Sequence, residues 1–264
     1  MFRRALFRAT ALAGLALALG GAASAQDLVV GANIGNVPWE FQDDTGAFVG
    51  FEIDLVNEIG KRLGREVTIE NIPFNGLFSA VQSGRIDMAV SSITITQERL
   101  KELTFAQPYY DSDQSLTVTA ASGLGSLADL SGKVIGVDTG STGDIWATEH
   151  QAEYGFGEIR RYEGLAPAML DLENGRIDGY ISDIPALQYY VKDKPQFTVA
   201  ERIPTGEQYS IMFAKDSPLA AEVDAILTDL KNEGFIAATH ETWFGAAPEA
   251  TTSTATVMDM PVLQ

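Results

Sequence analysis

The chain has 264 residues, of which 36 are acidic and 18 are basic, and its formal net charge is −18. Nucleic acids and anionic membrane surfaces repel a protein this acidic, so neither is an expected partner. The chain contains no cysteine and only two histidines, which excludes disulfides and a lipid-modified cysteine and leaves no recognisable metal cluster. We therefore expect neither a metal nor a cofactor.

Residues 1–25 have the features of an export signal. Three arginines near the start precede an Ala/Leu-rich run, and Ala23-Ser24-Ala25 fits an A-x-A cleavage site. The apolar run is too short for a membrane anchor. Arg3-Arg4 fits the twin-arginine route only loosely, so the general secretory route is favoured. The expected product is a soluble protein of the periplasm, with no direct insertion into a membrane.

The next residues predict a buried strand at 28–32 and a loop beyond it. Pro38 excludes a central strand in this loop, and the amides of Asn33 and Asn36 could hydrogen-bond a ligand. A core helix, a strand at 67–70 and a second helix follow. Phe74 begins the second helix and could stack on a ligand, although packing in the core explains it equally well.

Hydroxyl side chains gather where the buried strand 86–90 becomes a helix. Ser91, Ser92 and Thr94 follow the strand, and Arg99 lies about one turn inside a helix for which Thr96 is the expected N-cap. Ligands of open α/β sheets bind beyond the carboxyl ends of the strands, and a guanidinium pairs with two carboxylate oxygens. The segment therefore favours a site for a small carboxylate, although such residues are often only caps and surface groups.

A second copy of this context lies further along the chain. Ser83–Ser92 is echoed by Asn174–Asp183, and both contain Gly-Arg-Ile-Asp before a short strand. Two equivalent strand ends indicate two facing lobes, the second offering Ser182 and Asp183. A guanidinium on one wall and a carboxylate on the other would fit a zwitterion. The alternative is that Gly-Arg-Ile-Asp is merely a common way to leave a helix and enter a strand.

A polar run at 111–114 and a strand at 116–120 indicate the crossing into the second lobe. There, a strand at 133–137 runs into the loop Asp138–Asp144, which includes Ser141 and Thr142 and enters a helix. This loop lacks the Gly-Lys-Ser/Thr ending of a phosphate-binding loop, so contact with a small ligand is favoured.

The last third predicts a helix at 185–191, a strand at 197–200 and an extended return crossing at 207–214. Two helices follow, and residues 246–264 have no periodicity and are expected to form a disordered tail. The expected organisation is lobe 1 at 26–110, lobe 2 at 111–207 and a return to lobe 1 at 208–245.

Several motifs together resemble the family 3 extracellular solute-binding proteins, the periplasmic polar amino-acid receptors of ABC importers. These motifs are Pro38-Trp39-Glu40-Phe41, Gly50-Phe51-Glu52-Ile53-Asp54-Leu55, the Ser92–Arg99 run, Phe105 with Tyr109-Tyr110, Gly140-Ser141-Thr142, Asp183 and Trp243-Phe244-Gly245. The resemblance implies a type II periplasmic binding protein fold of the α/β class. Each lobe would be a mixed sheet flanked by helices, with two crossing segments between them. It also implies a monomer that delivers an amino acid to a transmembrane permease.

The resemblance also implies roles for single residues. Arg99 would pair with the ligand α-carboxylate, aided by Ser92, Thr94 and Thr142, and Asp183 would accept the α-ammonium. The side-chain pocket would draw on Asn33, Asn36, Phe74 and Asp138. Several family members have an acidic residue at the place of Asn33 and an aromatic one at that of Asn36, and glutamine receptors have lysine at that of Asp138. The ligand side chain therefore stays open, with a polar, basic or amide amino acid favoured.

Two other functions are compatible with the same resemblance. Some relatives of this fold are cyclohexadienyl dehydratases, which act on arogenate or prephenate, and two carboxylates in a cleft could do acid work. Against this, no histidine or glutamate stands among the strand-end residues. A receptor sensing module is disfavoured because no membrane helix or signalling domain follows Gly245.

Overall fold

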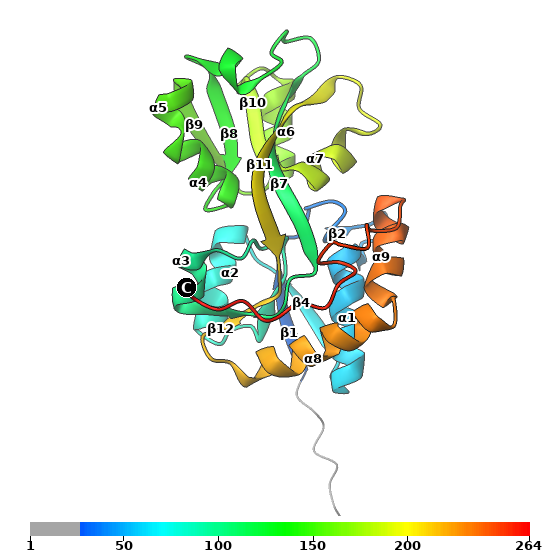
Figure 1. The fold of residues 1–264 in the computed structure, drawn as a ribbon. Helices are drawn as coiled ribbons and strands as arrows, with labels where there is room; N and C mark the ends of the chain where they lie inside the picture. The colour runs from blue at the N-terminus through cyan, green and yellow to red at the C-terminus, as the bar shows by residue number, and fades with distance from the viewer. Residues whose placement is uncertain (1–26) are drawn as a thin grey trace, which may run out of the picture.

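The computed structural model describes residues 27–264, which form two lobes, each built on a five-stranded sheet (Figure 1). The export signal expected at residues 1–25 lies outside the described residues. None of the helices within 27–264 has the length and apolar character needed to cross a membrane.

The sheet of lobe 1 has the strand order β4-β1-β5-β12-β6. Its strands are β4 (Val67–Asn71), β1 (Leu28–Ala32), β5 (Met88–Ala89), β12 (Met212–Ala214) and β6 (Leu103–Phe105). Strand β1 runs parallel to β4 and β5, whereas β12 is antiparallel to β5 and β6. The carboxyl ends of β1 and β5 therefore meet at one edge of the sheet.

Helices cover both faces of this sheet. One face packs against α1 (Phe51–Leu63), α8 (Pro218–Asn232) and α9 (Phe235–Phe244), and the other against α2 (Phe74–Gln82) and α3 (Gln97–Glu102). A small hairpin of β2 (Phe41–Gln42) and β3 (Phe48–Val49) precedes α1. The expected N-cap of α3 is confirmed, because the Thr96 hydroxyl accepts a hydrogen bond from the Arg99 amide.

The sheet of lobe 2 has the strand order β11-β7-β10-β8-β9. Its strands are β11 (Phe197–Tyr209), β7 (Tyr110–Thr119), β10 (Gly179–Asp183), β8 (Val134–Asp138) and β9 (Glu158–Tyr162). The flanking helices are α4 (Thr142–Glu149), α5 (Gln151–Tyr154), α6 (Leu165–Glu173) and α7 (Ile184–Val191), with a short 3-10 helix η1 (Leu127–Leu130). The carboxyl ends of β8 and β10 point toward lobe 1.

Strands β7 and β11 are long and run from lobe 2 down to lobe 1 (Figure 1). They pair antiparallel from Phe197 opposite Thr119 to Tyr209 opposite Tyr110. The sequence predicted shorter strands here because residues 111–115 are polar. Most of these polar residues are buried. Ser112 and Gln114 form hydrogen bonds with β11, and Ser115 donates to the carbonyl of Ser182 in β10, so these positions are satisfied although they lack the apolar pattern of a core strand.

The repeated Gly-Arg-Ile-Asp segment has the same structural role in both lobes. Gly84 and Gly175 have φ angles of 72° and 66°, as expected where a helix ends. Asp87 accepts a hydrogen bond of 2.9 Å from the Val29 amide, and Asp178 accepts one of 2.8 Å from the Val134 amide. Each aspartate therefore ties its strand to the neighbouring strand, and the repeat builds the scaffold on which the site stands.

The C-terminal segment 246–264 contains no helix or strand, but it packs along lobe 1 instead of extending from it as a disordered tail would (Figure 1). The Ser253 amide donates to Asp111, and the Met258 amide donates to Gln107. Lys231 of α8 donates to the carbonyl of Thr256 at 2.9 Å. These contacts join residues more than twenty positions apart, so composition alone does not show them.

Candidate functional site

A cavity of about 110 Å³ lies between the two lobes, beyond the carboxyl ends of their central strands. Because one water takes about 30 Å³ of liquid volume, this space suits a small polar molecule. Eleven of the twelve residues that the sequence offered for the site line it: Asn33, Asn36, Phe74, Ser91, Ser92, Thr94, Asp138, Ser141, Thr142, Ser182 and Asp183. The sequence did not assign the other part of the wall, which Ile34, Gly35 and Glu163–Pro167 form.

Arg99 is the predicted residue that does not line the cavity. Its guanidinium donates to the carbonyl of Thr94 at 2.6 Å in lobe 1 and to that of Gly140 at 3.3 Å in lobe 2. It also lies 5.6 Å from the ring centre of Phe74 and 4.9 Å from that of Phe78. Burial lowers the pKa of Arg99 to about 10, which still leaves the side chain charged at neutral pH. The cation thus stands directly behind the wall that Thr94 and Phe74 form.

Asp183 at the end of β10 faces lobe 1 across the cavity. Ser92 donates to one oxygen of its carboxyl group at 3.2 Å, and Gln114 donates to the other at 2.6 Å. Asn36 in turn donates to Ser92 at 3.1 Å. Burial, and then the charge of Glu207, raise the pKa of Asp183 to about 7. A cation bound here would restore full ionisation of this carboxyl group.

Glu207 of β11 is a buried carboxylate that holds both lobes together. One of its oxygens accepts hydrogen bonds from Thr94 of lobe 1 at 2.7 Å and from Thr142 of lobe 2 at 2.9 Å. The other oxygen accepts from Gln114 at 3.0 Å. Both threonine hydroxyls therefore donate their hydrogen bonds to Glu207, and their oxygen atoms can only accept hydrogen bonds from other neighbours.

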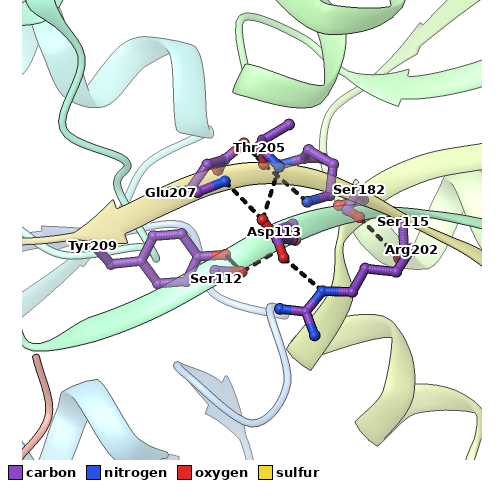
Figure 2. A network of polar contacts seen from close by, with 10 residues as sticks. Ser112, Asp113, Ser115, Ser182, Arg202, Thr205, Glu207 and Tyr209 are labelled. Carbon is purple, nitrogen blue, oxygen red and sulfur yellow. Dashed lines mark hydrogen bonds and ion pairs between the residues drawn. The ribbon is translucent and has the colours of Figure 1, made fainter. Parts of the chain in front are cut away.

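Asp113 of β7 shapes the strand that carries Glu207 (Figure 2). Its carboxylate accepts from the amides of Thr205 and Gly206, both at 2.7 Å, and from Arg202 at 2.5 Å. Burial raises the pKa of Asp113, but these hydrogen bonds outweigh it and hold the pKa below its usual value. The β11 register shifts just before Glu207, so Asp113 secures the bulge that turns Glu207 toward the cavity.

Asp138 at the end of β8 is the carboxyl group of the lobe 2 wall. One of its oxygens accepts from the Tyr180 hydroxyl at 2.7 Å, while the other, Oδ1, is buried and accepts no well-aligned hydrogen bond within residues 27–264, although the Gly164 backbone amide lies close enough to lower the pKa of the group. Burial raises the pKa of Asp138 to about 6. Asn33 of lobe 1 lies close by, because its side-chain amide nitrogen faces Gly164, whose backbone amide lies next to Asp138. A Cβ atom placed on Gly164 would be 3.7 Å from that nitrogen. Asp138 and Asn33 thus form one end of the cavity.

The family of bacterial extracellular solute-binding proteins, family 3, matches this chain over residues 28–246. The chain belongs to this family. The arginine-binding extracellular protein ArtP of Bacillus subtilis (strain 168) is 28% identical over 228 residues, which is 85% of this chain and 89% of that protein. The L-cystine-binding protein TcyJ of Escherichia coli (strain K12) is 29% identical over 223 residues, 83% of each chain.

Solved structures confirm the predicted fold of this family 3 protein. The arginine-, lysine-, histidine-binding protein ArtJ of Geobacillus stearothermophilus superposes with a TM-score of 0.78 at 34% identity, over 85% of this chain and 97% of that one. The two-lobed α/β architecture expected from the sequence is therefore correct. The family consists of solute-binding proteins, in agreement with the cavity between the lobes.

The sequence did not indicate Glu207 and Gln114 as site residues of this family 3 protein. Both lie in the crossing strands. A polar residue that interrupts an apolar pattern is predicted from sequence to be exposed, so neither residue was expected in a buried site. Only the location of these residues in the predicted crossing segments could have indicated them, because both crossings pass next to the cavity. Glu40 and Glu52 were noticed only as parts of motifs, and both are fully buried beside the predicted serines.

Proposed function

We propose that the protein captures a cationic L-amino acid between its two lobes in the periplasm and delivers it, as a monomer, to the permease of an ABC importer. The observation that carries the proposal is Asp138 Oδ1, a buried carboxyl oxygen at the cavity that accepts no well-aligned hydrogen bond within the described chain. A buried acceptor without a partner costs about 1–3 kcal/mol, so a ligand donor at this place is favourable.

The charges around the cavity support a positively charged ligand. Asp138, Glu163 and Asp183 line it, Glu207 lies behind its threonines, and no described lining residue is basic. A second positive group besides the α-ammonium would stabilise Asp138 and Glu163 at the side-chain end. The named ligands of two relatives agree with this, since ArtP is an arginine-binding protein and ArtJ an arginine-, lysine-, histidine-binding protein, whereas TcyJ is an L-cystine-binding protein.

The ligand backbone would be held by both lobes. Asp183 and Ser92 would accept the α-ammonium, and Arg99 would take the α-carboxylate by exchanging its carbonyl partners for it. The start of α4 at Thr142 offers free amides to the same carboxylate. Hydrogen bonds to charged groups contribute about 1.5–3 kcal/mol each, which can offset the cost of ordering and closing the lobes. A ligand that bonds both walls favours the closed form, and the permease would recognise that form.

The substitution Asp138→Asn tests the proposal. L-arginine should bind the variant at least about tenfold more weakly than wild type, because one charge-assisted bond is lost, whereas L-glutamine should lose much less. Calorimetric titration of both ligands measures this difference. The control is Asp193→Asn, which removes an exposed carboxylate from the same lobe and should change neither affinity. Equal losses for both amino acids, or turnover of arogenate or prephenate by the wild type, would contradict the proposal.

A further inference from the structure

Two buried glutamates lie directly beneath the serines of the cavity wall. Glu40 precedes the β2–β3 hairpin, Glu52 is in the first turn of α1, and both have no exposed surface. Glu40 Oε1 accepts from the Ser91 hydroxyl at 2.6 Å and from the Asn36 amide group at 3.2 Å. These contacts connect a fully buried acid to two residues that line the cavity.

Glu52 supports Ser92, a third residue of the cavity wall. Its Oε1 accepts from the Ser92 amide at 2.8 Å and from the Tyr109 hydroxyl. Ser92 has a φ angle of 44°, in the left-handed region that residues other than glycine rarely adopt. The hydrogen bond from its amide to Glu52 helps to hold this conformation, which turns the Ser92 hydroxyl toward Asp183.

The two carboxyl groups also lie close enough for each to act on the pKa of the other, and a hydrogen bond between them needs a proton. The second oxygen of each, Oε2, is buried and finds no donor from any other described residue. Two carboxylates only accept hydrogen bonds, so two ionised groups in contact would repel and leave both Oε2 atoms unsatisfied. One proton between them satisfies both atoms at once.

We infer that Glu40 and Glu52 share a single proton and that this acid–carboxylate pair positions Asn36, Ser91 and Ser92 for ligand binding. Glu40 is the protonated member. Its Oε1 accepts from Ser91 and Asn36 while its Oε2–H donates to Glu52, and Glu52 then accepts from Glu40, Tyr109 and Ser92. Every donor and acceptor of the pair has a partner in this arrangement.

The direction of the pKa shifts agrees with this assignment. Burial raises the pKa of Glu40 well above its usual value, and the charge of Glu52 raises it further. Burial also raises the pKa of Glu52, but the hydrogen bonds from Glu40, Tyr109 and the Ser92 amide oppose this effect. Tyr109 stays protonated, since burial and the charge of Glu52 raise its pKa as well. Glu40 is therefore the group that keeps a proton at neutral pH.

Infrared spectroscopy of the ligand-free protein at pH 8 tests the shared proton. At this pH Asp183 and Asp138 are ionised, because their pKa values are about 7 and about 6. The wild type should still show the C=O stretch of one protonated carboxyl group. Glu40→Gln should abolish it, and the control Glu70→Gln, on the half-buried β4, should retain it. Absence of the band from the wild type, or its persistence in Glu40→Gln, would overturn the inference.

Thermal unfolding between pH 5 and pH 8 gives a second readout. The native wild type holds one proton that the unfolded chain releases near its ordinary pKa of 4.5, so stability falls as pH rises toward the native pKa. The unfolding equilibrium constant should rise by up to about tenfold per pH unit from this proton. Glu40→Gln should remove that one-proton dependence, because an amide cannot ionise. An unchanged dependence in Glu40→Gln would contradict the shared proton.

A comparison of two Glu40 variants tests the positioning role. Glu40→Gln keeps an acceptor for Ser91 and a donor for Glu52, whereas Glu40→Ala keeps neither. With L-arginine as probe, Glu40→Gln should bind at least about tenfold more tightly than Glu40→Ala. Equal affinities would refute the positioning role. A wild type that binds neither L-arginine nor L-lysine would refute the proposed function, while both measurements on the ligand-free protein would still decide the shared proton.

Discussion

The substitution Glu207→Gln should move the pH dependence of ligand binding. Asp183 and Glu207 both accept from one nitrogen of Gln114, at 2.6 and 3.0 Å, so their oxygens lie no more than 5.6 Å apart. At this separation and an effective dielectric constant of about 20, two negative charges repel by about 3 kcal/mol, or about two pKa units. Burial raises the pKa of Asp183 still more, and hydrogen bonds from Gln114 and Ser92 oppose both effects, so the pKa stands at about 7.

Because of this repulsion, the ligand affinities of the wild type and of Glu207→Gln should respond differently to acid. A ligand ammonium requires ionised Asp183, so wild-type affinity should fall by up to about tenfold per pH unit as the pH drops below 7. Removing the charge of Glu207 should lower the pKa of Asp183 well below 7, so Glu207→Gln should lose little affinity between pH 8 and pH 6. Calorimetric titrations of L-arginine at pH 8, 7 and 6 measure both dependences.

The matched control for this experiment is Glu201→Gln, which lies on the same strand and accepts from the Leu127 amide, away from the cavity. It should keep the wild-type pH dependence. Asp138, with a pKa of about 6, contributes about twofold at pH 6 in every variant and does not obscure the comparison. The reasoning fails if Glu207→Gln loses affinity in acid as steeply as the wild type.

Three further predictions concern single features of the structure. Arg99→Ala should abolish binding of amino acids because its guanidinium is the cation that stands directly behind Thr94 and Phe74, and retained micromolar affinity in a titration would refute the assignment. Asp113→Asn should weaken L-arginine binding by several-fold through loosening of the β11 bulge, and an unchanged dissociation constant would show that Asp113 does not position Glu207. Deletion of residues 247–264 removes at least three hydrogen bonds to lobe 1 and should lower the melting temperature by about 5–10 °C, whereas an unchanged melting temperature would mean that the segment does not stabilise the fold.

The local elements of this fold follow from sequence patterns. Apolar residues at helical spacing, the Thr96 cap and the two helix-ending glycines predict helices and strands within a few residues of their observed bounds. The crossing strands and the C-terminal segment were harder to predict. Residues 111–115 are polar and residues 246–264 have no periodicity, and both segments find hydrogen-bond partners far away in the chain, as Ser253 does with Asp111. Only the folded chain shows where these partners lie.

The cavity was largely predictable because its residues stand at the carboxyl ends of parallel strands. Ser92 and Asp183 were expected on facing walls, and they are joined across the cavity. Arg99 was expected at the ligand but lies behind the wall, because its guanidinium reaches two backbone carbonyls that the sequence cannot place. Glu207 and Glu40 were missed as site residues, since a buried carboxyl group depends on partners from distant segments that no local pattern records.

The most direct test of the account is a calorimetric titration of the wild-type protein after unfolding and refolding to remove any bound ligand. The ligands are L-arginine, L-lysine, L-histidine, L-glutamine and L-cystine at pH 8. The account predicts one-to-one binding of L-arginine or L-lysine, at least about tenfold tighter than L-glutamine, because only a cationic side chain pairs with Asp138. Tighter binding of L-glutamine or L-cystine than of any basic amino acid would contradict the central claim.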